Sequence, residues 1–92
     1  MLYTNLVKYY TYISMENKID KLLLLKKFGL NVKIARLKKG WTQEQFAEKL
    51  NKHLTHVGKI ETGRMNMSLG KILELAQALD IDINKLLYID QE

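Results

Sequence analysis

The stretch from Thr42 to Gly63 constrains the fold of this chain more than any other part of its sequence. We interpret it as two short helices joined by a tight turn, because apolar residues lie on one side of each segment and polar, basic or small residues lie on the other. Thr42 and Gln45 have the spacing of a capping box, which starts the first helix. Asn51 stands at the turn, where asparagine tolerates the left-handed backbone conformation. We expect the second helix to run from about Leu54 to Thr62.

A longer helix is expected before this stretch, over about residues 18–39. Its apolar residues, Leu22 and Leu23 among them, follow one another at spacings of three and four. Gly29 interrupts the pattern, and we expect it to weaken or bend the helix. Gly40 comes after two lysines and provides the stop signal, because late cations followed by a glycine are typical of a helix end.

Two more helices are expected after the central stretch. Ser68 is placed to cap a helix with a wide apolar face that reaches Leu79, and Asp82 is placed to cap a short last helix. The chain contains no proline, which favours uninterrupted helices. The pattern therefore predicts an all-α fold of five helices in one domain.

The first 14 residues differ from the rest, since they hold four of the five tyrosines and show no clean helical or strand period. One hypothesis is that Met15 is the natural start and that the preceding residues are an upstream in-frame extension. The alternative is an arm that packs on the core or on a partner. The intact mass of the native product distinguishes the two. We divide the chain into an extension (1–17), a domain (18–89) and a frayed tail (90–92).

The net charge of +5 is unevenly distributed along the chain. Residues 1–40 hold nine Lys/Arg and two acidic residues, whereas residues 65–92 hold two Lys/Arg and five acidic residues. A basic front and an acidic back suit docking onto a polyanion such as nucleic acid. The alternative reading is that AT-rich genomes encode lysine-rich proteins whatever their function.

The composition also excludes several classes of protein. The absence of cysteine excludes a disulfide framework and thiolate metal sites. No apolar run approaches the roughly 20 residues that span a bilayer, and no signal-peptide pattern opens the chain. We therefore expect a cytoplasmic protein without a membrane partner.

Five residues in the central stretch carry a family resemblance: Gln43, Ala47, Asn51, Val57 and Ile60. Their spacing lets two helices cross closely at a small residue, turn sharply, and place two apolar residues on the inner face of the second helix. This stretch resembles the phage-repressor and Cro-type helix-turn-helix family, also called the Xre family. The implied fold is a lambda-repressor-like DNA-binding domain with an N-terminal extension.

The resemblance covers about residues 28–87. Its further matches are Arg36 before the first stop signal, Glu61 with Gly63 at the end of the third helix, and the run AQAL followed by a DID turn. The family usually has glycine where this chain has Asn51, and Lys52-His53 replaces its common apolar and Ser/Thr pair. Among relatives, the chain most resembles the small controller proteins of restriction–modification systems.

The resemblance implies that the second helix of the motif enters the major groove of DNA and reads base edges there. The residues at its start and on its outer face are the expected base contacts: His53, Leu54, Thr55 and Lys59. For Leu54, a core contact is the alternative. Flanking residues are expected to contact phosphates and to position the protein without reading sequence: Gln43, Lys52, His56, Arg64 and Asn66.

Other matching residues imply structural roles. Ala47, Val57 and Ile60 hold the angle between the two helices of the motif. Arg36 and Glu61 match residues that form a largely buried salt bridge in the family, and losing one partner of such a pair costs about 3–5 kcal/mol. The alternative for these two residues is a pair of separate surface charges.

One recognition helix reads about 4–6 base pairs, which is too few for genomic specificity. We therefore expect a homodimer on a pseudo-palindromic operator in double-stranded DNA. Apolar residues of the last two helices are expected to form the dimer surface: Ile81, Ile83, Leu87 and Tyr88. An antitoxin, a phage-type repressor, or a protein-interaction module that has lost DNA binding remain alternatives.

The sequence shows no nucleophile motif, no glycine-rich phosphate loop and no acid pair in an evident cleft, so we expect no enzyme. His53 and His56 lie three residues apart, but no Asp, Glu or Cys nearby completes a tetrahedral metal site. We expect no metal, no cofactor and no small-molecule effector.

Overall fold

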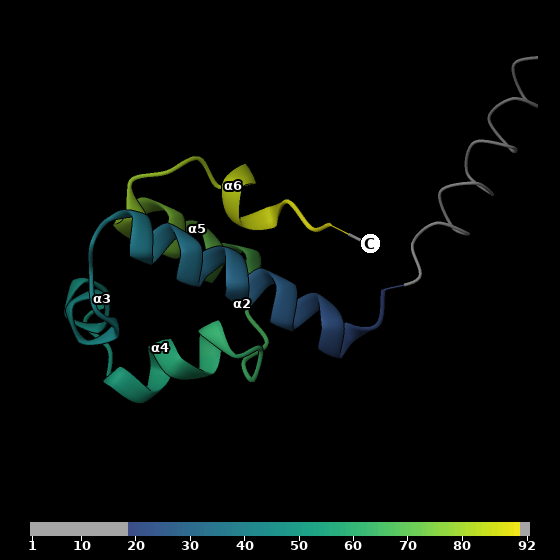
Figure 1. The fold of residues 1–92 in the computed structure, drawn as a ribbon, viewed down its shortest axis with the longest axis horizontal. Helices are drawn as coiled ribbons and strands as arrows, with labels where there is room; N and C mark the ends of the chain where they lie inside the picture. Colours follow the sequence, from purple (N-terminus) through teal and green to yellow (C-terminus); the bar gives the residue numbers. More distant parts are fainter. Residues whose placement is uncertain (1–18, 91–92) are drawn as a thin grey trace, which may run out of the picture.

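The computed structural model describes residues 19–90, which fold into five α-helices (Figure 1). The helices are α2 (Lys21–Lys38), α3 (Gln43–Leu50), α4 (Leu54–Glu61), α5 (Leu69–Leu79) and α6 (Asn84–Leu87). Over this range the chain forms no strand. The predicted all-α class with five helices is confirmed. The predictions for the first 14 residues and for a start at Met15 lie outside the described residues.

Side-chain caps begin the longer helices. The Asp20 carboxylate accepts a hydrogen bond from the Leu23 amide at 2.7 Å and starts α2. Thr42 and Gln45 form the predicted capping box of α3, in which each side chain bonds the other residue's backbone N–H. Ser68 caps α5 as predicted, since its hydroxyl accepts from the Lys71 amide at 3.2 Å.

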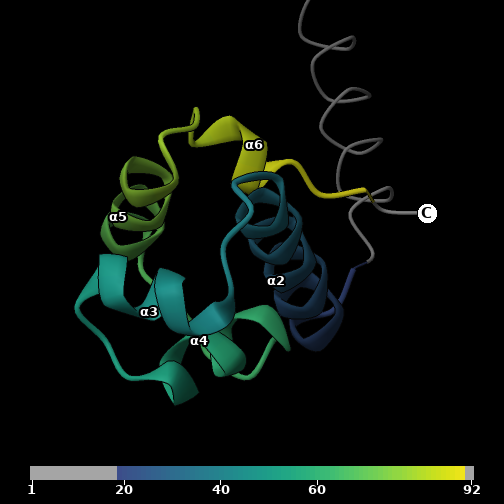
Figure 2. The ribbon, with the colours of Figure 1, turned by 60° about the vertical axis from the view of Figure 1, so that its left-hand side comes forward.

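The core lies where α2 packs against α4, α5 and α6 and where α3 packs against α4 and α5. Figure 2 shows α3, α4 and α5 gathered on one side of α2. The buried apolar residues come from every helix of the described range: Phe28, Val32, Phe46, Ala47, Val57, Ile60, Ile72, Leu75, Ala76, Leu79 and Leu86. The core therefore fixes the α3–α4 unit against the rest of the domain.

Gly29 has a different role from the predicted one. It lies inside α2, which runs without a break from Lys21 to Lys38, and it is buried. A Cβ atom at this position would lie 2.4 Å from the Ile60 carbonyl oxygen and 2.7 Å from that of Glu61. Glycine is needed here because the backbones of α2 and α4 approach too closely for a side chain.

The first helix also begins later than predicted, at Lys21 instead of residue 18. Leu22 and Leu23, which the pattern placed on the buried face, are 58% and 43% exposed. The helix carries apolar residues on more than one side, and only the side with Phe28 and Val32 meets the core. Spacing alone does not decide which of two apolar sides is covered.

The C-terminal end of the domain differs from expectation in two details. The Asp82 carboxylate accepts from the Asn84 amide at 2.8 Å, but Ile83 occupies the N-cap position of α6. The backbone carbonyl of Asp90, assigned to a frayed tail, accepts a hydrogen bond from the Lys27 ammonium. The chain therefore returns to α2 near its end.

None of the helices described in residues 19–90 is long and apolar enough to cross a membrane.

Candidate nucleic-acid interface

The two helices of the central motif are joined by the sharp turn that the sequence predicts. Asn51 adopts the left-handed conformation with φ 54° and ψ 46°, and the Lys52 amide donates to the Ala47 carbonyl at 2.9 Å. Ala47, Val57 and Ile60 are all at least 97% buried. They pack α4 against α3, so the orientation of α4 is set by these core contacts.

His53 begins α4. Its Nδ1 accepts a hydrogen bond from the Thr55 amide at 3.1 Å and lies 2.9 Å from the Thr55 hydroxyl oxygen. In the neutral ring an acceptor at Nδ1 places the proton on Nε2. The cap therefore leaves His53 with an N–H donor on the other side of its ring.

The remaining predicted base contacts lie on the surface. Leu54 is 44% exposed and is not one of the buried core residues. Thr55 and Lys59 are exposed and lie four residues apart on α4, so they share one face of the helix. These three side chains and that of His53 are free to meet a ligand placed along the start and outer face of α4.

A buried ion pair ties α2 to α4, as predicted for Arg36 and Glu61. The Arg36 Nε donates to Glu61 Oε2 at 2.6 Å, and its Nη2 donates to Oε1 at 3.1 Å. The Arg36 Nη1 donates to the Trp41 carbonyl at 2.7 Å, and the Gln43 amide donates to Glu61 Oε1 at 3.0 Å. This network connects the first residue of α3 to the last residue of α4.

The Arg64 side chain is oriented by a hydrogen bond at the C-terminal end of α4. The Thr62 hydroxyl donates to the Gly58 carbonyl at 2.7 Å and accepts from the Arg64 Nε at 2.9 Å. The Arg64 amide donates to the Lys59 carbonyl at 2.8 Å. Thr62 was absent from the predicted site residues, because nothing in the sequence marks a threonine at a helix end as a support for a later arginine. Asn66, beyond Arg64, is exposed.

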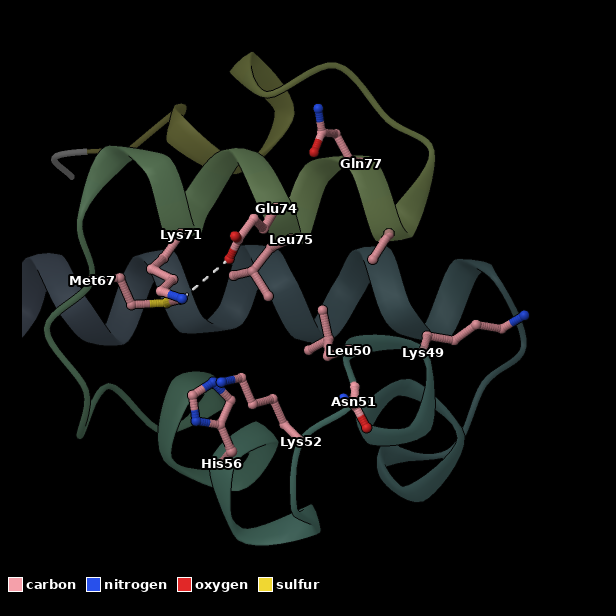
Figure 3. A pocket seen from close by; sticks show the side chains of 11 residues that line it. Lys49, Leu50, Asn51, Lys52, His56, Met67, Lys71, Glu74, Leu75 and Gln77 are labelled. Carbon is pink, nitrogen blue, oxygen red and sulfur yellow. Dashed lines mark ion pairs between the residues drawn. The ribbon is translucent and has the colours of Figure 1, made fainter.

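A surface pocket of about 380 Å³ opens between the motif's turn and α5 (Figure 3). Lys52 and His56 line its lower side, and the Lys71–Glu74 ion pair of α5 lines its upper side. Partial burial lowers the pKa of His56 below 6.5, and the positive charges of Lys52, Lys71 and Lys59 lower it further. The structure thus brings Lys71, which the sequence did not single out, close to two predicted phosphate contacts.

The predicted dimer residues have two kinds of environment. Ile81 and Ile83 are half-buried and pack against the core. Leu87 is 37% exposed and Tyr88 is 75% exposed. Of these four residues, only Tyr88 therefore presents most of its surface outward. Among residues 19–90, no group of three or more His, Cys, Asp or Glu residues is placed to hold a metal ion.

The family model described as Helix-turn-helix (HTH_3) matches residues 32–86, which is more than half of the chain. The chain belongs to this helix-turn-helix family. The resemblance to Xre-type proteins, stated from the spacing of a few residues, is confirmed.

Relatives of this helix-turn-helix protein include a hypothetical transcription factor of Neisseria meningitidis serogroup B, which is 36% identical over 62 residues. That match covers 67% of this chain, and this chain spans only 58% of that relative's length.

Solved structures show the same fold. The restriction–modification controller protein C.AhdI from Aeromonas hydrophila is 42% identical, with a TM-score of 0.63, over 67% of this chain and 94% of the other. The Neisseria transcription factor NHTF is 32% identical, with a TM-score of 0.69, over 79% and 84% of the two chains. ClgR from C. glutamicum, at 24% identity and a TM-score of 0.68 over 76% and 90%, supports the fold alone.

Proposed function

We propose that this protein is a sequence-specific DNA-binding transcriptional regulator that inserts α4 into the major groove. The observation that carries the proposal is the combination of a buried, ion-paired inner face of α4 with four exposed side chains at its start and outer face. A helix held rigidly by its scaffold can present side chains to base edges in one register. Residues 18–89 form the DNA-binding domain in this proposal.

Base contacts come from His53, Leu54, Thr55 and Lys59. Lys59 donates to guanine O6 or N7, and Leu54 packs against a thymine methyl group. Because Nδ1 of His53 accepts the capping hydrogen bond, its ring offers the groove a donor at Nε2 and not an acceptor. His53 therefore favours guanine or phosphate oxygen over an exocyclic amino group.

Phosphate contacts come from the residues around the motif: Gln43, Lys52, His56, Arg64 and Asn66. Gln43 combines two tasks, since its amide also braces Glu61 at the end of α4. Arg64 approaches a phosphate in a fixed orientation because Thr62 holds its Nε. Contacts of this kind set register and affinity and carry no sequence information.

The active species in this proposal is a homodimer on a pseudo-palindrome with half-sites about 34 Å apart. Tyr88 and Leu87 provide the exposed apolar surface for the dimer contact, with Ile81 and Ile83 beside them. The acidic residues near the C-terminal end then stay away from the DNA.

We assign the protein to the controllers of restriction–modification systems, on the basis of its 42% identity to one such controller. An antitoxin or a phage-type repressor would share the fold. The neighbouring genes distinguish these possibilities, because a controller should lie beside a methyltransferase and a nuclease.

Selection of bound duplexes from a random pool tests the proposal and yields the operator. The affinity for the selected duplex should fall steeply with salt, and six phosphate contacts predict a slope of log K against log salt near about −5. A flat slope, together with no retardation of any duplex, would contradict DNA binding and would favour a protein-interaction module of the same fold.

A further inference from the structure

Lys71 lies on the flank of α5 and belongs to neither the core nor the DNA contacts proposed above. It is in the first turn of α5, and its side chain is 55% exposed. At 3.6 residues per turn, Lys71 is turned roughly 90° from the middle of the buried side of α5. Its side chain therefore leaves the helix beside the core and lines the pocket between α5 and the motif's turn (Figure 3).

The pocket carries mostly positive charge. Of the described residues that line it, three are lysines, one is a histidine and one is a glutamate. Lys49 is directed elsewhere, because its ammonium lies over the ring of Trp41, 5.1 Å from the centroid, and Figure 3 shows its side chain pointing away from His56. The other cationic or basic side chains come from the turn, from α4 and from α5, in the order Lys52, His56 and Lys71.

These side chains are close enough for their charges to interact. The pKa of His56 is lowered first by partial burial and then by the positive charges of Lys52, Lys71 and Lys59. Lys71 therefore acts electrostatically on His56 although the two residues belong to different helices. An anion seated between them would meet positive charge from both helices, which suits a phosphate group.

The flank of α4 that carries His56 is also where a DNA strand would pass. His56 is turned roughly 80° from the middle of the outer face that Thr55 and Lys59 share. The major groove is about 12 Å wide, and an α-helix with its side chains is about 10–12 Å across. The flanks of a helix in the groove therefore meet the phosphates. With α4 in this position, one strand passes His56 and the first turn of α5.

We infer that Lys71 is a further contact to the phosphate backbone of DNA, beside Lys52 and His56, and that Glu74 holds its ammonium while no DNA is bound. The inference rests on the proposed function, because it requires α4 to lie in the major groove. The Lys71 Nζ lies 3.5 Å from Glu74 Oε2, and both side chains are more than half exposed. An exposed ion pair of this kind is weak, so a phosphate can replace the carboxylate as the partner of Lys71.

Lys71→Ala in the full-length chain tests the contact. It should weaken binding to operator and random duplexes alike, by roughly five- to tenfold at about 0.1 M salt, and reduce the slope of log K against log salt by about 0.9. Lys85→Ala is the matched control, because it removes the same charge from α6, which Figures 1 and 2 show on the opposite side of the domain from α4. It should bind as the parent does. No loss in Lys71→Ala, or equal losses in the two variants, would overturn the inference.

Glu74→Gln tests the competing ion pair. The change leaves Lys71 without its carboxylate partner, so the affinity for every duplex should rise by roughly two- to fivefold at about 0.1 M salt. Asp80→Asn is the control, since it removes a negative charge from the other end of α5, and asparagine tolerates the left-handed backbone of Asp80, with φ 53°. Equal gains in both variants would contradict the role of Glu74.

The double variant shows whether Glu74 acts through Lys71. When Lys71→Ala is already present, Glu74→Gln should change the affinity by less than about 1.5-fold, because the two residues are coupled. The full gain in both backgrounds would overturn the competition for Lys71. A parent protein that binds no duplex would contradict the proposed function itself, whereas a parent that binds no better than Lys71→Ala would contradict only this inference.

Discussion

Lys59 and Arg64 flank the end of α4, but different contacts orient them. Lys59 is exposed on the outer face of the helix, whereas Arg64 is held through its Nε by the Thr62 hydroxyl. A flexible donor on the groove face suits base edges, and a fixed guanidinium beside the helix end suits a phosphate. Truncating Lys59 should therefore change sequence preference, whereas truncating Arg64 should change the affinity for all duplexes.

Lys59→Ala should lower the preference for the operator over random DNA by about 1–3 kcal/mol, since it removes a base contact. Arg64→Ala should weaken binding to all duplexes alike and reduce the salt slope by about one. Titrations of both variants on operator and random duplexes measure these effects. If Lys59→Ala weakened both duplexes equally, Lys59 would be a phosphate contact.

His56, which lines the pocket beside α5, makes the stability of the protein depend on pH. Its pKa is lowered in the folded state because partial burial and the charges of Lys52, Lys71 and Lys59 disfavour the imidazolium. The unfolded chain then binds more protons than the folded chain as pH falls through the range just below 6.5. The stability contributed by neutral His56 is present above that range and is lost below it.

His56→Gln should therefore flatten part of the loss of stability between about pH 7 and pH 5. Urea titrations across this range measure the change. The control is His53→Asn, which keeps a capping side chain at α4 and leaves His56 in place. A phosphate beside His56 would favour the imidazolium, so operator affinity should rise as pH falls in the parent protein and rise less in His56→Gln. An unchanged pH profile of affinity would remove His56 from the phosphate contacts.

At the scale of the elements, the position of α4 depends on how closely α2 approaches it. Gly29 allows this approach, and the buried pair of Arg36 and Glu61 locks it. The two features act on the same face of α2, since Gly29 and Arg36 are seven residues, or about two helical turns, apart. The angle at which α4 meets DNA is thus set by a helix that does not touch DNA in the proposed mechanism.

Gly29→Ala should destabilise the protein by roughly 1–3 kcal/mol, because its methyl group would force α2 and α4 apart. Gly58→Ala is the matched control, since a Cβ atom at that position would have no neighbour within 4 Å. It should leave stability unchanged or raise it by up to about 1 kcal/mol through better helix propensity. Thermal unfolding of both variants measures the difference, and equal stability would show that α2 and α4 separate without cost.

For the whole molecule, the proposed function requires two copies on one operator. Tyr88→Ala should weaken dimer formation by about tenfold, because large exposed aromatics commonly anchor interfaces. Leu69→Ala, at an exposed apolar residue at the start of α5, should leave dimer formation unchanged. Sedimentation with and without operator measures the species present. A protein that stays monomeric at micromolar concentration in both conditions would contradict the dimer model.

The prediction of the helices succeeded where the signal is local. The capping box of Thr42 and Gln45, the Ser68 cap and the left-handed Asn51 each depend on side chains and backbone within a few residues. The family resemblance rests on the same kind of information, because the motif's helices, their turn and their spacing lie within one short stretch. The sequence by itself therefore determined the elements, their order and the helix-turn-helix motif.

The tertiary structure decided which surfaces are covered. Spacing shows that α2 has apolar residues on two sides, but only packing shows that Leu22 and Leu23 stay exposed while Phe28 is buried. Gly29 reads as a helix breaker in the sequence and becomes a contact residue only when Ile60, 31 positions later, lies against it. Thr62 and Lys71 likewise gain their roles from neighbours. The physical reason is that burial, close approach and electrostatic environment depend on residues distant in sequence, which no local pattern records.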